Sequence, residues 1–239
     1  MTNYLRRILA GFMLFTAELT LTLVIGVLGV VGFLALGREV LDQDAAVFDA
    51  RAFHWARHLL GANESGWVEK VTFLASRNFI STVALLLIGY FLFVRRHRWY
   101  TLLVPVVALG SITLNLVLKN TYQRPRPLLP LVSASGLSFP SGHAMISASF
   151  YGLLIYLVLT HVRQHKALRL ALVAGLVGLI LLIGLTRVYL RVHYASDVLA
   201  GFTAGLVWLL IAIPLLKQIE KSVKKRYKYA PQLAEKQPE

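Results

Sequence analysis

The sequence predicts an all-α, polytopic membrane protein built as a bundle of six transmembrane helices. Hydrophobic residues make up 57% of the 239 positions, and the mean hydropathy is +0.65. Charged residues make up only 15%, whereas a typical soluble domain has about 25%. The hydrophobic residues also come in long blocks, and a block of about 20 apolar residues spans the hydrocarbon core of a bilayer.

Six such blocks follow one another along the chain, at residues 8–36, 79–94, 99–118, 144–160, 168–185 and 198–216. Each must be helical, because lipid offers no partner to unpaired backbone groups. Residues 1–216 then form one six-span domain, and residues 217–239 form a basic tail. The basic segment Met1–Arg7 leads into the first block without a clear small-residue cleavage site, so we expect a retained signal anchor.

The net charge of +14 does not indicate nucleic acid as a partner, because the basic residues lie in short clusters between the apolar blocks. The expected partners are the bilayer and a membrane-borne substrate. The chain contains no cysteine, which excludes thiolate chemistry and disulfides.

The distribution of basic residues predicts the orientation. With six spans, both termini share a side, and that side carries fifteen Lys and Arg residues against three acidic residues. The opposite side carries ten basic and seven acidic residues. Lys and Arg favour the cytoplasm, so we expect cytoplasmic termini. The loops at residues 37–78, 119–143 and 186–197 would then lie outside the cell membrane.

A short amphipathic helix is expected in the first outer loop, at about residues 44–60. Phe48, Ala52, Trp55 and Leu59 recur there at helical spacing, while Asp49 falls on another face. The apolar stripe is typical of a helix that lies on a membrane surface, but it also suits a helix packed against the bundle. The sequence leaves both interpretations open.

Three polar clusters interrupt the apolar chain, and all of them fall on the predicted outer side. Lys119 to Pro127 follows the third span, Phe139 to His143 precedes the fourth, and Thr186 to Asp197 joins the fifth to the sixth. Because a helical bundle brings loops of one side together, we expect a single site.

The charges in these clusters predict phosphate binding. Lys119, Arg126 and Arg187 supply cations, and the arginine fork matches phosphate oxygens. Ser141 and Gly142 open a helix, whose free N–H groups and positive dipole end favour an anion.

Two histidines and an aspartate add catalytic groups. His193 and Asp197 are neighbours if the sixth helix begins early enough to include both, and a carboxylate on one ring nitrogen leaves the other free to attack. His143, beside the anion-binding turn, would protonate the leaving group. The reaction would pass through a phosphohistidine. No carboxylate cluster suits Mg²⁺, so we expect neither a metal nor a cofactor.

The three clusters resemble the signature of the type-2 phosphatidic acid phosphatase superfamily. Its pattern is lysine, six residues, Arg-Pro; then Pro-Ser-Gly-His; then Ser-Arg, five residues, His, three residues, Asp. Lys119, Arg126 and Pro127 match the first part, Pro140 to His143 match the second, and Arg187, His193 and Asp197 match the third. Thr186 stands where the pattern has serine, a change that keeps the hydroxyl.

The resemblance implies a lipid phosphatase with His193 as nucleophile, Asp197 as its orienting partner and His143 as general acid. Lys119, Arg126, Ser141, Gly142 and Arg187 would bind phosphate. The substrates implied are phosphatidic acid, phosphatidylglycerophosphate or polyprenyl diphosphates such as undecaprenyl diphosphate. A phosphotransferase with the same intermediate, or a membrane transporter with a basic vestibule, are the alternatives.

Some polar residues lie outside the pattern. We interpret Arg124 and Arg191 as interfacial anchors. Glu18 lies within the first span, and a structural role is expected for it. The loop between Pro127 and Phe139 is short and apolar, which favours modest headgroup selection and a broad lipid phosphatase. The oligomeric state is left open.

Overall fold

The computed structural model describes the backbone of residues 2–61 and 65–234, and the side chains of residues 20–61 and 66–224. The side chain of Glu18, the basic residues before it and those after Lys224 lie outside the described side chains. All regular structure in the described part is helical. The predicted fold class is therefore confirmed.

The helices are α1 (Thr2–Leu41), α2 (Ala46–Leu60), α3 (Ser65–Phe73), α4 (Arg77–Gly89), α5 (Arg98–Tyr122), α6 (Gly142–Ile146), α7 (Gly152–His161), α8 (Lys166–Tyr189) and α9 (Ala195–Ala234). A π-helical turn at Tyr90–Val94 extends α4, and another at Ser147–Tyr151 joins α6 to α7. Among the described residues, six stretches are long and apolar enough to cross a membrane, at residues 20–41, 66–94, 98–122, 142–161, 166–189 and 195–224.

The second span differs most from its predicted bounds. Its apolar stretch begins at residue 66 rather than 79 and includes α3, which was not predicted. Charged residues such as Lys70 and Arg77 interrupt the sequence pattern there and hide the start of the span. A break after Phe73 separates α3 from α4, and Ser76 caps α4 by accepting a hydrogen bond from the Phe79 amide.

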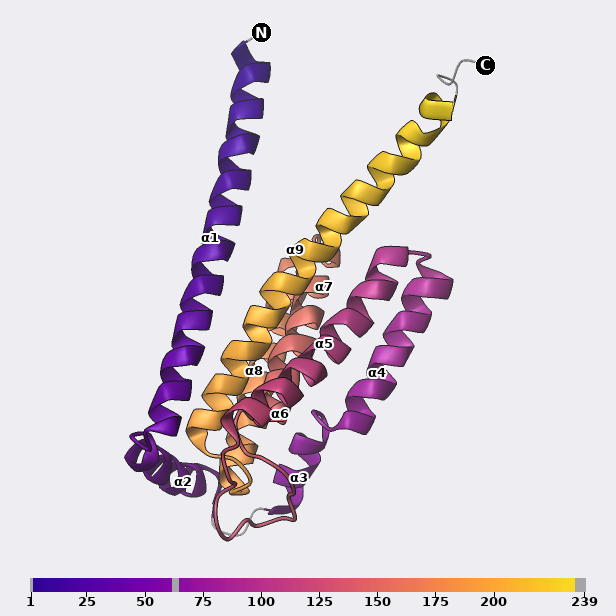
Figure 1. Cartoon of the computed structure of the whole chain (residues 1–239). Coiled ribbons are helices and arrows are strands. Elements are labelled where there is room, and N and C mark those ends of the chain that lie inside the picture. Colours follow the sequence, from indigo (N-terminus) through magenta and orange to yellow (C-terminus); the bar gives the residue numbers. More distant parts are fainter. Residues whose placement is uncertain (1, 62–64, 235–239) are drawn as a thin grey trace.

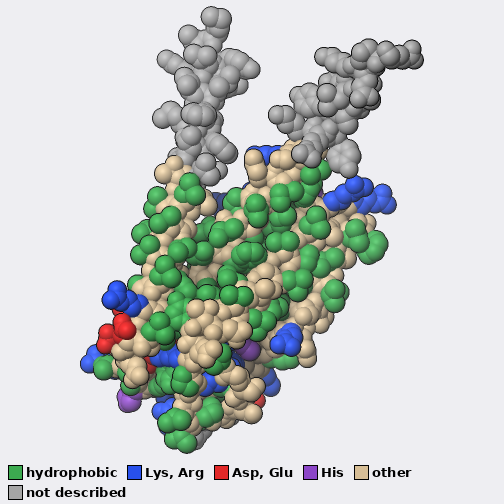
Figure 2. Space-filling view, viewed as in Figure 1, with side chains coloured by type: hydrophobic (Ala, Val, Ile, Leu, Met, Phe, Trp, Pro, Cys, Tyr) green, Lys and Arg blue, Asp and Glu red, His purple; other side chains and the backbone are tan. Residues whose placement is uncertain are grey.

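The other spans were predicted in the right places but too short. The first continues to Leu41, and α9 runs without interruption from Ala195 through the expected domain end at residue 216 to Ala234. The division between the six-span domain and the tail stays a prediction. Apolar side chains cover the sides of these helices in the space-filling view, as lipid-facing surfaces require (Figure 2).

Helix α9 lies at the centre of the bundle and contacts α1, α5, α6 and α8 (Figure 1). Two glycines one helical turn apart permit its close approach to the helix that starts at Gly142. A Cβ on Gly201 would lie 2.6 Å from the Ser141 carbonyl oxygen, and one on Gly205 would lie 2.3 Å from that of Met145. Small residues at this spacing let transmembrane helices pack backbone to backbone.

The loops that carry the polar clusters meet at one end of the bundle, together with α2 and α3 (Figure 1). The beginning of α1 and the far end of α9 lie at the opposite end. This arrangement brings together the end of α5, the start of α6, the end of α8 and the start of α9. These are the segments that the sequence predicts to form the site.

Helix α2 confirms the helix expected in the first outer loop. Its predicted apolar stripe does not enter the protein core, because Phe48, Trp55 and Leu59 are 49%, 63% and 64% exposed. The side of α2 that faces the bundle instead buries Asp49 and Ala56. Ala52 of the stripe packs against the bundle, while the larger stripe side chains border a groove shared with α8 and α9. Both interpretations of this helix therefore stay predictions.

Candidate active site

The predicted site residues come from six segments that meet at the loop-bearing end of the bundle. Lys119 lies in the last turn of α5, Arg126 in the following loop, and Ser141, Gly142 and His143 at the start of α6. Arg187 lies in the last turn of α8, His193 in the short link after it, and Asp197 in the first turn of α9.

His193 and Asp197 face each other even though the helix does not contain both of them. The condition that the sixth helix includes both residues is not met, because α9 begins at Ala195. Asp197 lies at the third position of α9 and accepts a hydrogen bond at 2.9 Å from the Tyr194 amide, as an acidic residue does in a capping box. This bond turns the carboxylate back toward the link, where its Oδ2 lies 3.5 Å from His193 Nδ1.

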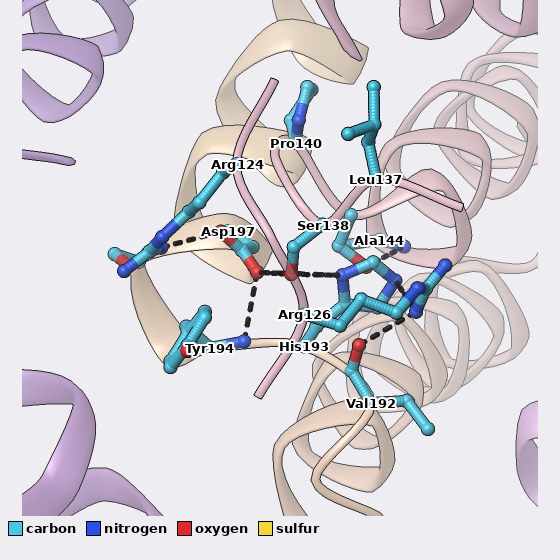
Figure 3. A network of polar contacts seen from close by, with 12 residues as sticks. Arg124, Arg126, Leu137, Ser138, Pro140, Ala144, Val192, His193, Tyr194 and Asp197 are labelled. Carbon is cyan, nitrogen blue, oxygen red and sulfur yellow. Dashed lines mark hydrogen bonds and ion pairs between the residues drawn. The ribbon is translucent and has the colours of Figure 1, made fainter. Parts of the chain in front are cut away.

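Ser138 joins the same carboxylate and was missed by the sequence analysis. Its hydroxyl donates to Asp197 Oδ2 at 2.5 Å and lies 3.4 Å from His193 Nδ1 (Figure 3). Ser138 is fully buried. The sequence carries no signal for it, since it is one of several serines in an otherwise apolar loop.

These contacts fix the tautomer of His193. With Asp197 Oδ2 and Ser138 on the Nδ1 side, Nδ1 carries the proton and Nε2 keeps its lone pair. Arg126 Nη1 lies 3.3 Å from Nε2, so the free nitrogen points at a cation (Figure 3). Burial lowers the pKa of His193 to about 4, Arg187 and Arg126 add to this shift, and Asp197 opposes it. The imidazole is therefore neutral at physiological pH.

Backbone carbonyls hold two of the predicted phosphate-binding cations in place. Arg126 donates from Nε to Ser135 and Gly136 and from Nη1 to Val192, at distances from 2.7 to 3.1 Å. Lys119 Nζ donates to the carbonyls of Leu137 and Ser138. Both cations thus brace the loop between Pro127 and Phe139 around the histidine.

Arg187 differs from these two cations, because it is hydrogen-bonded to a side chain of α3. Its Nη1 donates to Thr72 Oγ1 at 2.7 Å, and the residue is 8% exposed. Its Nε is the one buried side-chain nitrogen or oxygen without a hydrogen-bond partner among the described residues. An unpaired buried donor is costly, so an anionic oxygen fits this position. Thr72 was not predicted as a partner.

His143 lines a cleft of about 180 Å³ between α4, α5 and α6. Its other lining side chains are small or apolar, except for the polar Ser76, Ser111 and Asn115 and the charged Arg77. His143 interacts electrostatically with His193 and with the three cations Lys119, Arg126 and Arg187. Asn115 also donates to the Pro140 carbonyl at 3.2 Å, which holds the turn before His143 against α5.

Ser141 and Thr186 use their hydroxyl groups locally. Ser141 caps α6 by accepting from the Ala144 amide, and its own amide donates to the Asp197 carbonyl at 2.9 Å. Thr186 Oγ1 donates to the Ile183 carbonyl one turn back in α8. A serine at position 186 can make the same bond, which explains why the departure from the family pattern leaves the site intact.

The interpretation of Arg124 as an interfacial anchor is wrong. Its side chain is only 14% exposed, and its Nη1 lies 2.6 Å from Asp197 Oδ1. The proline residues on either side of Arg126 extend the chain, so Arg124 points into the protein beside α9. Arg191 is half-buried and lies over the ring of Phe53 at 5.5 Å.

Comparison with known proteins gives the family. The family model of the PAP2 superfamily matches residues 99–221, which include all three polar clusters. The chain belongs to the PAP2 superfamily. As a PAP2 enzyme it is a multi-pass membrane phosphatase, a hydrolase acting on lipid phosphates.

Individual relatives agree with this assignment. Phosphatidylglycerophosphatase B of Bacillus subtilis (strain 168) is 38% identical over 141 residues, which are 57% of this chain and 68% of the relative. The crystal structure of a transmembrane PAP2-type phosphatidylglycerolphosphate phosphatase from Bacillus subtilis matches with a TM-score of 0.73 and 27% identity, over 81% of this chain and 96% of that one. Aquifex aeolicus LpxE shares the fold, with a TM-score of 0.55 and 21% identity over 69% of this chain and 94% of that one.

Proposed function

We propose that this PAP2 enzyme removes the terminal phosphate of phosphatidylglycerophosphate through a phosphohistidine on His193. The observation that carries the proposal is the environment of His193, whose Nδ1 faces Asp197 while its Nε2 faces Arg126. The proposed substrate is taken from the related proteins found in Bacillus subtilis, whose names describe them as phosphatases for this lipid.

In the first half-reaction, His193 Nε2 attacks phosphorus and the bond from phosphorus to the lipid oxygen breaks. His143 donates its proton to that oxygen, so phosphatidylglycerol leaves as a neutral alcohol. Asp197 stabilises the positive charge that develops on the imidazole. Lys119, Arg126 and Arg187 offset the charge on the three phosphoryl oxygens, and the free Nε of Arg187 offers a donor for one of them.

In the second half-reaction, water attacks the phosphohistidine and the nitrogen–phosphorus bond breaks. His143, now neutral, takes the proton of the attacking water, and inorganic phosphate is released. Three fixed cations supply the electrostatic stabilisation that a divalent metal supplies in other phosphoryl transfers. We therefore propose that the reaction needs no metal ion.

The site lies at the end of the bundle opposite the start of α1. We propose that this end faces the outside of the cell membrane and that both termini are cytoplasmic, because the opposite end carries the larger share of Lys and Arg. The substrate would reach the site from the outer leaflet. The cleft lined by His143 lies between membrane-spanning helices and would offer a lateral path for the headgroup.

The proposal is tested with purified protein and a panel of phosphatidylglycerophosphate, phosphatidic acid and undecaprenyl diphosphate of matched purity. We expect phosphate release that is highest with phosphatidylglycerophosphate, unaffected by EDTA and lost by at least about 10³-fold in His193→Ala, since removal of a covalent nucleophile costs this much or more. Undiminished turnover in His193→Ala would refute the mechanism. Transfer of phosphate to an added lipid or sugar alcohol in place of water would identify a phosphotransferase.

A further inference from the structure

We propose that Asp49 and Arg124, neither of which belongs to the three family motifs, are positioning residues that hold the Asp197 carboxylate against His193. The inference rests on the proposed role of His193 as nucleophile. It gives α2 a part in positioning the proposed catalytic groups.

The contacts form a closed network around one guanidinium group. Arg124 Nη1 donates to Asp197 Oδ1 at 2.6 Å, and Nη2 donates to Asp49 Oδ2 at 2.8 Å. Asp49 also accepts from the amide and the hydroxyl of Ser196, at 2.9 and 2.8 Å. The ring of Tyr194 lies 3.9 Å below the guanidinium and closes the network on that side.

Both carboxylates in this network are buried, Asp49 at 1% exposed and Asp197 at 0%. Buried carboxylates require partners, because desolvation of an isolated charge is costly. A single arginine lies between them, and its side chain is only 14% exposed. Strong interactions are expected in this setting, in contrast to a surface ion pair.

The division of the arginine between two acids determines what Asp197 can do. A free arginine fork binds a carboxylate through both of its oxygens. In this protein Asp49 accepts the hydrogen bond from Nη2, so Arg124 donates to Asp197 at Oδ1 alone. Its Oδ2 is left for Ser138, the Tyr194 amide and His193. Loss of Asp49 would release Arg124 to take both oxygens and draw the carboxylate away from the imidazole.

The test compares Asp49→Asn, Arg124→Gln, Arg124→Lys and the double variant Asp49→Asn/Arg124→Gln with the wild-type full chain in detergent. We expect kcat to fall about 10- to 100-fold in the single variants Asp49→Asn and Arg124→Gln, the range for loss of a hydrogen bond to a charged group. KM should change by less than about twofold, because neither residue contacts the phosphate. Arg124→Lys keeps the charge without the fork and should recover part of the loss.

The double variant should be no slower than Arg124→Gln alone, since Asp49 acts through Arg124. Arg38 and Asp42 provide matched controls, because they form an exposed ion pair at 3.6 Å near the start of α2. Arg38→Gln and Asp42→Asn should leave kcat unchanged. Thermal unfolding of each variant identifies any that do not fold. If Asp49→Asn does not fold, the comparison of kcat between Arg124→Lys and Arg124→Gln tests the inference instead.

A second readout separates positioning from general loosening. The charged or titratable groups that face His193 are Asp197 on α9, Arg187 on α8, Arg126 in the loop and His143 on α6. In Asp49→Asn, the retreat of the Asp197 carboxylate from the ring should lower the pKa of His193 further, because Asp197 is the group that raises it. A merely structural role would loosen and hydrate the site, and the pKa of His193 would then rise toward the value of an exposed histidine.

Two results would overturn the inference: a kcat within twofold of wild type in both Asp49→Asn and Arg124→Gln, or additive losses in the double variant. Failure of the proposed function looks different, because His193→Ala would then keep full activity. With His193→Ala inactive and the Asp49 and Arg124 variants fully active, the phosphohistidine mechanism stands and the positioning role falls.

Discussion

At the scale of single residues, the site combines a buried neutral histidine with cations that are held by backbone carbonyls. His193 is 2% exposed, and desolvation keeps its imidazole unprotonated despite the neighbouring carboxylate. This favours nucleophilic attack, because only the neutral ring has a lone pair on Nε2. In the proposed mechanism, Asp197 would stabilise the positive charge that develops on the ring.

The protonation of His193 can be measured directly. Its pKa of about 4 lies below the usual value near 6.5, so we expect the ring to remain neutral as the pH falls through 6 and to protonate only near pH 4. Because the folded-state pKa is lowered, this histidine contributes stability that is fully present above pH 6.5 and is lost as the pH falls toward 4.

Histidine NMR in micelles, with His193→Gln to assign the signal, follows this titration. A midpoint for His193 at or above 6 would contradict the account of burial.

The motif residues of the site were predictable because their types and spacing carry the chemistry. His143, His193, Asp197 and the three cations could be proposed from the chain alone. Asp49 and Ser138 could not, since an aspartate on an amphipathic helix and a serine in a loop have many ordinary roles. Only the three-dimensional contacts distinguish them.

At the scale of secondary structure elements, the position of the site depends on how closely α9 approaches the start of α6. Gly201 faces the Ser141 carbonyl, one residue before the Gly142–His143 pair. Backbone cannot move aside as a flexible side chain can. The glycine therefore sets the distance between the helix that bears Asp197 and the helix that bears His143.

Gly201→Ala should destabilise the protein by about 1–3 kcal/mol, the usual cost of overpacking, and should also lower kcat by moving His143. Gly175→Ala is the matched control, because a Cβ there meets no atom within 4 Å. Alanine is the better helix former, so this control should be as stable as wild type or more so. Thermal unfolding and phosphate release check both variants, and a Gly201→Ala protein equal to the control would refute the role of this contact.

The spans themselves could be predicted from apolar runs, but their ends could not. Helix α8 extends to Tyr189, beyond the predicted end at residue 185, because Thr186 and Arg187 continue the helix into the site. Helix α3 was missed because its charged residues break the apolar pattern. Polar residues at a membrane interface remain helical when they have partners, which the chain does not reveal by itself.

At the scale of the whole molecule, one end of the bundle carries the proposed catalytic groups and α2, while the other end carries the start of α1 and the far end of α9 (Figure 1). The sequence predicted this separation from the placement of its loops. It could not predict that α2 contributes a buried acid to the network around Asp197. Contacts of this kind join residues that are far apart in the chain.

The absence of cysteine from the 239 residues makes the proposed orientation easy to test. Ser133→Cys in the loop after α5 and Ser222→Cys in α9 each introduce one exposed thiol. In intact cells, a membrane-impermeant maleimide should label Ser133→Cys and leave Ser222→Cys unlabelled until the membrane is permeabilised. The reverse pattern would place the active site in the cytoplasm.

The central claim is that His193 forms a covalent bond to phosphorus, and rapid-quench labelling tests it most directly. Wild-type protein mixed with phosphatidylglycerophosphate that carries ³²P in its terminal phosphate should acquire label within one turnover. The label should be stable in alkali, labile in acid and located on the peptide that contains His193, and His193→Gln should acquire none. Full turnover by wild-type protein with no protein-bound label at any time, under conditions in which His193→Gln is inactive, would contradict the covalent mechanism.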